Sequence, residues 1–373
     1  MIFVTRNRLS CGMKLAHNPV LPTSDAYLLR AGVVLTPDLL QRLQRFDNLD
    51  GVFIEDGFGD EETAIRPILS RRVRDEAIDN LQGMFHAALE DSQTMGLTQM
   101  RSIKSTVSEI ISSIQGAKQV MVNINDLKAY DDYTYHHCLS VAVLSVAAGI
   151  EMKIPERELQ SLGLAAILHD IGKMMVPIQI INKPARLTPQ EFNIIKKHPM
   201  YGIQYLEKYQ LGNKLVSNGI AMHHERIDGR GYPFGIRDTQ IPLFARIISI
   251  TDVYDALTSK RPYRAPLQPF EATEYMMANC GKAFDQDIMQ AFLNKLELYP
   301  KGSYVRLNDN EYYLVVDTEN NFRPVVRALT PPFDTIDLCS PEYLSLVVTR
   351  AVDQIPPDEL DRIYAQLQQG GAV

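Results

Sequence analysis

Residues 159–173 read LQSLGLAAILHDIGK, an apolar run that ends in a histidine, an aspartate and a lysine. Apolar or small residues at nearly every position predict a buried helix rather than a helix at the surface. In such a setting His169 and Asp170 are costly unless they are paired or bind a metal. The stretch therefore indicates a helical domain whose interior contains a polar site.

Two further runs have the same character on either side of this stretch. Residues 137–150 read HCLSVAVLSVAAGI, and residues 241–259 read IPLFARIISITDVYDALTS. Both predict buried helices, and Asp252 is another carboxylate embedded in an apolar run. Residues 129–297 as a whole predict helix after helix joined by polar loops.

The flanking segments predict three smaller parts. Residues 1–62 read as an α+β module, in which Gly32 makes a turn between two strands and Thr36 and Pro37 begin a helix. Residues 63–128 have apolar positions at helical spacing, such as Ile103 and Val107, and read as a helical connector. Its apolar face is suited equally to dimerisation and to packing within the chain.

Residues 298–373 alternate β-branched and aromatic residues around two turns, which predicts a three-stranded antiparallel meander. An amphipathic helix is expected from about Pro357 to Gln369. The predicted fold class is therefore mainly α, with a small α+β module before the helical domain and a short antiparallel β extension after it.

The composition excludes several classes of protein. The 373 residues have a net charge of -7 and a pI near 5.7, which argues against binding to a nucleic-acid polymer. No run approaches the roughly 18 apolar residues that a membrane span needs. The first residues have too few apolar positions for a signal peptide. The four cysteines are far apart and form no CxxC pair, so a reducing cytoplasm is the expected location.

Polar residues that can bind metals gather in the helical region. Six of the eight histidines lie between residues 136 and 224. Imidazoles with a few carboxylates suit iron, manganese, zinc or nickel. With Asp170 as a bridge, one ion can take His137, His169 and Asp252, and the other can take His198, His223 and His224. For each histidine alone, a buried imidazole with only hydrogen bonds is an alternative; for the whole set, metal binding is favoured.

Two metal ions about 3.5–4 Å apart are the usual apparatus for hydrolysing a phosphoester. A water that bridges them is deprotonated near neutral pH and attacks phosphorus in line. Lys173 follows His169 by four residues, where its ammonium can hold a phosphate oxygen. Solvation is the alternative for this lysine considered alone.

Three motifs in order resemble the HD-GYP family, bacterial phosphodiesterases of the HD superfamily that hydrolyse cyclic di-GMP. They are LHDIGK (168–173), HHERIDGRGYP (223–233) and TDVYDALTSKRPYR (251–264). DDYTYHHCLSVA (131–142) and a long match over 176–202 support the resemblance, which covers residues 130–297.

The resemblance implies an all-helical HD-type metallo-phosphohydrolase domain with a binuclear metal centre. It implies metal ligands at the seven residues named above and a catalytic role for Asp170 and Lys173. It places substrate contacts at Lys173, Gly231, Tyr232, Asp255, Arg261 and Arg264. Asp228, by contrast, is expected only to shape the loop.

One departure from the family concerns the position four residues before the first histidine ligand. Some members have a glutamate there that helps to hold a third metal, whereas this chain has Tyr133. A phenol is a poor ligand, so two divalent ions are expected, with iron or manganese favoured over zinc or nickel. The expected main product is linear pGpG rather than GMP.

Three alternatives to a cyclic di-GMP phosphodiesterase stay open at this point. They are a phosphohydrolase of another nucleotide such as cyclic GMP-AMP or a guanosine tetraphosphate, a catalytically silent cyclic di-GMP receptor or interaction module, and a DNA-binding role, which the acidic balance argues against. The retained ligand set argues against the receptor. A homodimer through residues 63–128 and protein partners such as diguanylate cyclases are compatible with the sequence.

Overall fold

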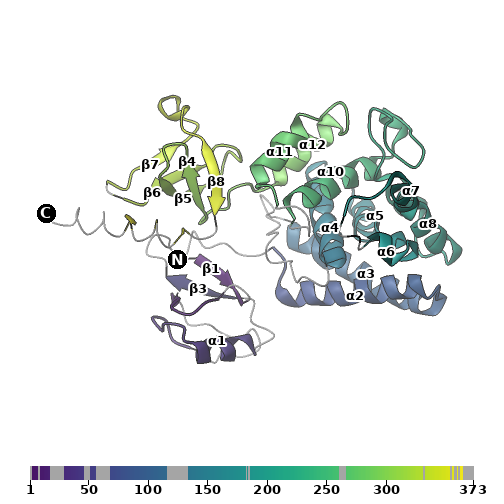
Figure 1. Ribbon diagram of the computed structural model, residues 1–373, viewed down its shortest axis with the longest axis horizontal. Helices are drawn as coiled ribbons and strands as arrows, with labels where there is room; N and C mark the ends of the chain where they lie inside the picture. Colours follow the sequence, from purple (N-terminus) through teal and green to yellow (C-terminus); the bar gives the residue numbers. More distant parts are fainter. Residues whose placement is uncertain are drawn as a thin grey trace. The chain divides into compact units, whose positions relative to one another are not determined.

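The computed structural model describes residues 2–6, 9–16, 29–45, 51–55, 68–115, 133–181, 183, 185–259, 266–330, 332–352, 355–356, 359 and 362–363. The chain forms two compact units (Figure 1). One is Ile68–Leu296, which is helical, and the other combines Met1–Pro67 with Glu297–Val373.

The helical unit is a succession of α-helices and short 3-10 turns. In chain order they are α2 (Arg71–Leu89), α3 (Gln93–Ile114), α4 (Tyr133–Glu151), α5 (Glu156–Ile167), η3 (Ile171–Met175), α6 (Ile178–Ile181), α7 (Pro189–Ile195), α8 (His198–Lys208), α9 (Lys214–Met222), η4 (Asp238–Gln240), α10 (Leu243–Thr258), α11 (Pro269–Met277) and α12 (Gln286–Lys295). Helix α4 packs against α2, α3, α5, α10 and α12, so it is the central element of this unit (Figure 1).

The three apolar runs of the sequence are α4, α5 and α10, and each is buried as predicted. Small side chains let these helices approach closely, and the Cβ of a residue larger than glycine at position 163 would run into Val107 of α3. Ser145 of α4 and Thr251 of α10 satisfy each other through a hydroxyl–hydroxyl hydrogen bond of 2.7 Å. Among the described helices, none is long and apolar enough to cross a membrane.

Helices α2 and α3 are part of the helical unit, which corrects the prediction of a separate connector over residues 63–128. They pack on each other, and α3 also packs on α4 and α5. The apolar face of α3 is buried, including Ile103, Val107, Ile110, Ile111 and Ile114. Packing within the chain, rather than dimerisation, therefore explains why these five positions are apolar.

The second unit contains two antiparallel sheets and one described helix, α1 (Pro37–Gln44). The strands are β1 (Ile2–Thr5), β2 (Lys14–Leu15) and β3 (Gly51–Glu55) in the order β1-β3-β2, and β4 (Tyr304–Leu307), β5 (Tyr312–Asp317), β6 (Val325–Ala328), β7 (Thr335–Asp337) and β8 (Val348–Val352) in the order β7-β6-β5-β4-β8. A 3-10 turn, η5 (Pro341–Tyr343), precedes β8.

The predicted N-terminal module and C-terminal extension are one unit because they share a core. Leu15, Leu43 and Ile54 from the N-terminal part belong to the same buried cluster as Tyr304 and Leu314 from the C-terminal part. Two separate parts at residues 1–62 and 298–373 were therefore a wrong division. Their shared core joins residues that are far apart in sequence, which local sequence patterns do not reveal.

Local details of this unit follow the sequence closely. Thr36 caps α1 by accepting a hydrogen bond from the amide of Leu39, and Pro37 is its first residue, as predicted. The predicted meander is β4, β5 and β6, to which β7 and β8 add at the two edges. Gly32 forms a turn with a φ of +82°, as predicted. The strand predicted after it is reduced to an isolated β-bridge between Val34 and Lys14. Most of the helix expected after Pro357 lies outside the described residues.

The contact between η3 and α8 has no space for a side chain at Gly172. A Cβ there would fall on the carbonyl oxygen of His198 and the amide nitrogen of Gly202, well inside contact distance. We expect Gly172→Ala to reduce the free energy of unfolding by about 1–3 kcal/mol, because backbone rather than a flexible side chain has to move. Urea denaturation measures this change.

Gly212→Ala is the matched control, since its Cβ would approach only the side chain of Val216 and no closer than 3.3 Å. Equal stability of the two variants would contradict the close approach of η3 and α8.

Candidate metal centre

Seven polar side chains meet inside the helical unit, each at a defined point of a helix. His137 is on the first turns of α4 and Asp252 is on α10, while the others lie where helices begin or end. His169 and Asp170 follow α5, His198 begins α8, and His223 and His224 follow the last residue of α9. The histidine pair thus lies at a helix end.

Hydrogen bonds at the Nδ1 atoms orient four of the imidazoles. Nδ1 of His169 lies 2.7 Å from the carbonyl oxygen of Ala166, Nδ1 of His198 lies 2.8 Å from that of Ile195, and Nδ1 of His223 lies 2.7 Å from that of Ile220. Each acceptor is three residues earlier, in the last turn of a helix, where carbonyls have no partner within the helix.

A carbonyl oxygen can only accept, so Nδ1 has to carry the proton in these three rings. Nδ1 of His137 contacts Oδ2 of Asp255 in the same manner, at 2.7 Å. In the neutral tautomer, Nε2 of each ring is then an unprotonated nitrogen that can bind a metal.

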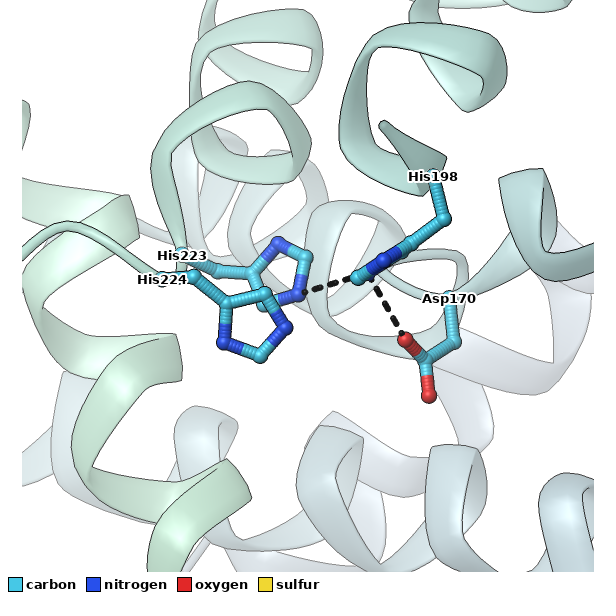
Figure 2. Close-up of side chains that lie close together, drawn as sticks. All are labelled: Asp170, His198, His223 and His224. Atoms are coloured by element: carbon cyan, nitrogen blue, oxygen red, sulfur yellow. Dashed lines mark hydrogen bonds and ion pairs between the residues drawn. The ribbon is translucent and has the colours of Figure 1, made fainter. Parts of the chain in front are cut away.

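The ligand atoms of these residues converge. Asp170, His198, His223 and His224 each offer an atom, and these atoms lie within 4.8 Å of one another (Figure 2). His137, His169 and Asp170 form a second such group, and His169, His223 and Asp252 form a third. Asp170 belongs to the first two groups, which is the arrangement expected of a bridging carboxylate.

Distances within the cluster support this division. Nε2 of His198 lies 3.2 Å from Oδ1 of Asp170 and 3.4 Å from Nε2 of His223, as the dashed lines in Figure 2 show. On the other side, Nε2 of His137 lies 3.2 Å from Oδ1 of Asp252 and 3.7 Å from Oδ2 of Asp170. The structure thus brings together all seven residues predicted as ligands.

Two buried atoms in the cluster indicate that the residues fit a metal. Nε2 of His169 and Oδ1 of Asp170 are inaccessible to water and have no hydrogen-bond partner. A buried polar atom without a partner costs free energy, and a bound cation offsets that cost. Imidazoles and carboxylates are a donor set suited to divalent first-row transition metals.

The imidazoles differ sharply in their affinity for protons. Burial opposes the charged form of His137, but hydrogen bonds to Asp252 and Asp255 outweigh burial and raise its pKa to about 9. Burial and the neighbouring imidazole of His224 lower the pKa of His223 well below its usual range. Burial also lowers the pKa of His224 to about 3. A metal at His137 therefore has to displace a proton, whereas His223 and His224 are neutral and ready to bind.

The carboxylates of the cluster are ionised. Burial raises the pKa of Asp170, but the charges of Lys173 and His169 hold it well below its usual range. Burial is likewise outweighed at Asp252, where His137 holds the pKa well below its usual range. Nζ of Lys173 lies 2.5 Å from Oδ2 of Asp170 and its side chain is 31% exposed, so its ammonium lies between the cluster and solvent.

The loop that follows the histidine pair is fixed by Glu225, which the sequence analysis did not single out. Oε1 of this buried carboxylate accepts from the amides of Phe234 at 2.7 Å and Gly235 at 3.1 Å. Gly231 has no room for a side chain because its Cβ would fall on the backbone of Glu225 and Arg226. These two amides directly follow Pro233, and the position of Glu225 between the histidine pair and this turn is the signal that could have identified it.

Tyr232 is held at the edge of the cluster by this loop. Its ring stacks on His224 with centroids 4.7 Å apart, and its amide donates to the carbonyl of His224 at 3.2 Å. Burial raises the pKa of the Tyr232 phenol, so the phenol stays protonated. Asp228 pairs with Arg226 and accepts from the amide of Arg230, which is the loop-shaping role expected of it.

Asp255 differs from the expectation of a substrate contact. It is 2% exposed, and its Oδ2 contacts both Nδ1 of His137 and the hydroxyl of Ser259. Asp252 and Asp255 are three residues apart on α10 and therefore point to the same side of the helix, toward α4. Asp255 contacts Nδ1 of His137, whereas Asp252 lies near Nε2. We therefore assign Asp255 as a positioning residue for His137. Arg261 and Arg264 lie outside the described residues, as does the side chain of Tyr133.

The sequence of this unit identifies its family. Residues 117–288 match the sequence profile of the HD domain family. This part of the chain is an HD domain. His169 and Asp170, which follow α5, lie within the matched residues, and the resemblance predicted from the motifs is confirmed at the level of the HD domain.

Three curated relatives share the HD domain. A cyclic di-GMP phosphodiesterase of Pseudomonas aeruginosa is 39% identical over 211 residues, which are 57% of this chain and 51% of that protein. A cyclic di-GMP phosphodiesterase of Thermotoga maritima is 36% identical over 52% of this chain and 53% of its own. The 3'3'-cGAMP-specific phosphodiesterase 1 of Vibrio cholerae is 31% identical over 51% and 43%. The chain thus matches about half the length of these relatives.

The bond from Asp255 to His137 generates a prediction. We expect Asp255→Asn to weaken metal binding by about 10- to 100-fold, because the amide no longer fixes the tautomer and orientation of the imidazole. Titration of the metal-free protein with Mn²⁺ against a competing chelator measures the affinity.

Asp287→Asn, at an exposed carboxylate on α12, is the control. If Asp255→Asn kept the metal affinity and raised only the KM for a substrate, Asp255 would be a substrate contact after all.

Proposed function

We propose that this protein is a metal-dependent phosphodiesterase that hydrolyses cyclic di-GMP to linear pGpG. The observation that carries the proposal is the convergence of five histidines and two carboxylates, Asp170 and Asp252, in one buried cluster. A site of this composition suits two divalent cations, and a pair of such ions is the usual apparatus for hydrolysing a phosphodiester. Relatives that share the HD domain have names that specify cyclic di-GMP phosphodiesterases.

Each part of the site has a proposed role. Asp170 would hold both ions, with His198, His223 and His224 as the other ligands of one ion and His137, His169 and Asp252 as those of the second. When bound, the ions act as Lewis acids toward the phosphate and lower the pKa of water at the site.

Lys173 is placed to bind a phosphate oxygen, because its side chain is partly exposed and its ammonium lies beside Asp170. The Gly231–Tyr232 turn limits the site on the side of His224 and can contact the substrate through its backbone and its neutral phenol. Arg261 and Arg264 are proposed to contact the substrate because the resemblance to the HD-GYP family places substrate contacts at these positions.

Turnover of cyclic di-GMP tests the proposal directly. Protein loaded with Fe²⁺ or Mn²⁺ without oxygen is expected to produce pGpG, detected by chromatography. Asp170→Ala is expected to reduce kcat/KM by at least about 100-fold, as is typical when a main electrostatic element of an active site is removed. Asp79→Asn, at an exposed residue of α2, is the control and should retain full activity.

Metal-loaded wild-type protein that binds the dinucleotide and never cleaves it would establish a receptor instead. Accumulation of GMP would overturn pGpG as the main product.

A hydrolase of cyclic GMP-AMP is the second candidate. It is favoured by the relatives in Vibrio cholerae whose names specify 3'3'-cGAMP. The same assay with a panel of cyclic dinucleotides separates the two, since the preferred substrate has the higher kcat/KM.

The number of ions is a separate proposal. We expect two ions per chain, iron or manganese rather than zinc or nickel, because Tyr133 replaces the carboxylate that would help to hold a third. Elemental analysis of protein purified without oxygen counts the ions, and three per chain would overturn this inference. A cytoplasmic location, a homodimer and diguanylate cyclase partners stay predictions of the sequence.

A further inference from the structure

An exposed aromatic ring lies beside the metal cluster. Phe192 of α7 is 43% exposed, although a phenylalanine is usually buried. Its ring meets the ring of Tyr232 edge-on, with centroids 6.3 Å apart and planes at 79°. Since Tyr232 in turn stacks on His224, the exposed ring is only two ring contacts from a proposed metal ligand.

Helix α7 holds this ring in a defined place. Thr188 and Glu191 form a reciprocal capping box at its start, and Glu191 also pairs with Lys183 at 2.7 Å. At its end, the carbonyl of Ile195 accepts the bond from Nδ1 of His198. The helix is therefore fixed at both ends, and the second of these ends is attached directly to the metal cluster.

A lysine places positive charge between the two rings. Nζ of Lys196 lies 4.8 Å from the centroid of Phe192 and 5.7 Å from that of Tyr232. Lys173 and Lys183 have carboxylate partners, but among the described residues no carboxylate lies within ion-pair distance of Lys196. Its charge is thus available to an anion that occupies this side of the cluster.

We propose that Phe192 and Lys196 form a subsite for one nucleoside of a cyclic dinucleotide. This inference rests on the proposed function, since it assumes that a phosphodiester of the dinucleotide lies at the metal cluster. The base next to that phosphate then stacks on the exposed part of Phe192, and Lys196 binds the second phosphate. Stacking on a phenyl ring is possible for every base, because each has a π face.

The chemistry of the subsite sets its selectivity. Phenylalanine has no hydrogen-bond donor or acceptor, so stacking on its ring adds affinity for any base but does not select guanine over adenine. The subsite therefore contributes equally to cyclic di-GMP and to cyclic GMP-AMP.

Steady-state kinetics of the metal-loaded full chain test the subsite. Phe192→Ala is expected to raise the KM for cyclic di-GMP by about 5- to 150-fold, the range for loss of one base–aromatic stack, and Phe192→Trp should restore it. Lys196→Gln should raise KM and make it less dependent on salt. The affinity for Mn²⁺, titrated against a competing chelator, should not change in the Phe192 variants, because Phe192 is not among the proposed ligands.

Phe322→Ala is the matched control, because Phe322 has nearly the same exposure, 42%, and belongs to the other unit. Wild-type turnover with an unchanged KM in Phe192→Ala would overturn the subsite and leave the proposed function intact. If wild type binds cyclic di-GMP without cleaving it and Phe192→Ala weakens that binding, the subsite stands and the proposed function fails. If wild type neither binds nor cleaves it, both fail.

Discussion

The hydrogen bond between a histidine Nδ1 and a carbonyl at the end of a helix is the constraint on which the rest of the site depends. It occurs at His169, His198 and His223, each time with the carbonyl three residues earlier. It satisfies a carbonyl that has no partner within its helix and places the proton on Nδ1. Nε2 is then unprotonated and faces the cluster. The ends of three helices therefore direct three nitrogen atoms into the same cluster.

The helices have to meet closely for these nitrogens to converge. The packing of η3 on α8 excludes any side chain at Gly172, and this contact places Asp170 beside His198. On the opposite side, α4 and α10 are joined by the bond between Ser145 and Thr251 and by that between His137 and Asp255. These four buried polar side chains are thus paired with one another, as burial requires.

The open side of the cluster is built differently, from a loop and a short helix. Glu225 fixes the loop by accepting hydrogen bonds from two of its backbone amides, and the loop places Tyr232 against His224. Helix α7 adds Phe192 and Lys196 beyond it. The proposed metal ligands therefore lie mainly at buried helix ends, and the proposed substrate contacts lie on this more exposed margin.

The sequence by itself determined the helical fold of the HD domain and pointed to the seven residues of the polar cluster, because polar residues such as Asp170 and Asp252 are anomalous within apolar runs. Local rules also located the cap at Thr36. Only the tertiary structure showed that Asp255 orients His137 and that Glu225 accepts hydrogen bonds from the loop. It also showed that the N-terminal and C-terminal segments pack in one core. Those features depend on contacts between residues far apart in sequence, such as His137 and Asp255, which no spacing along the chain encodes.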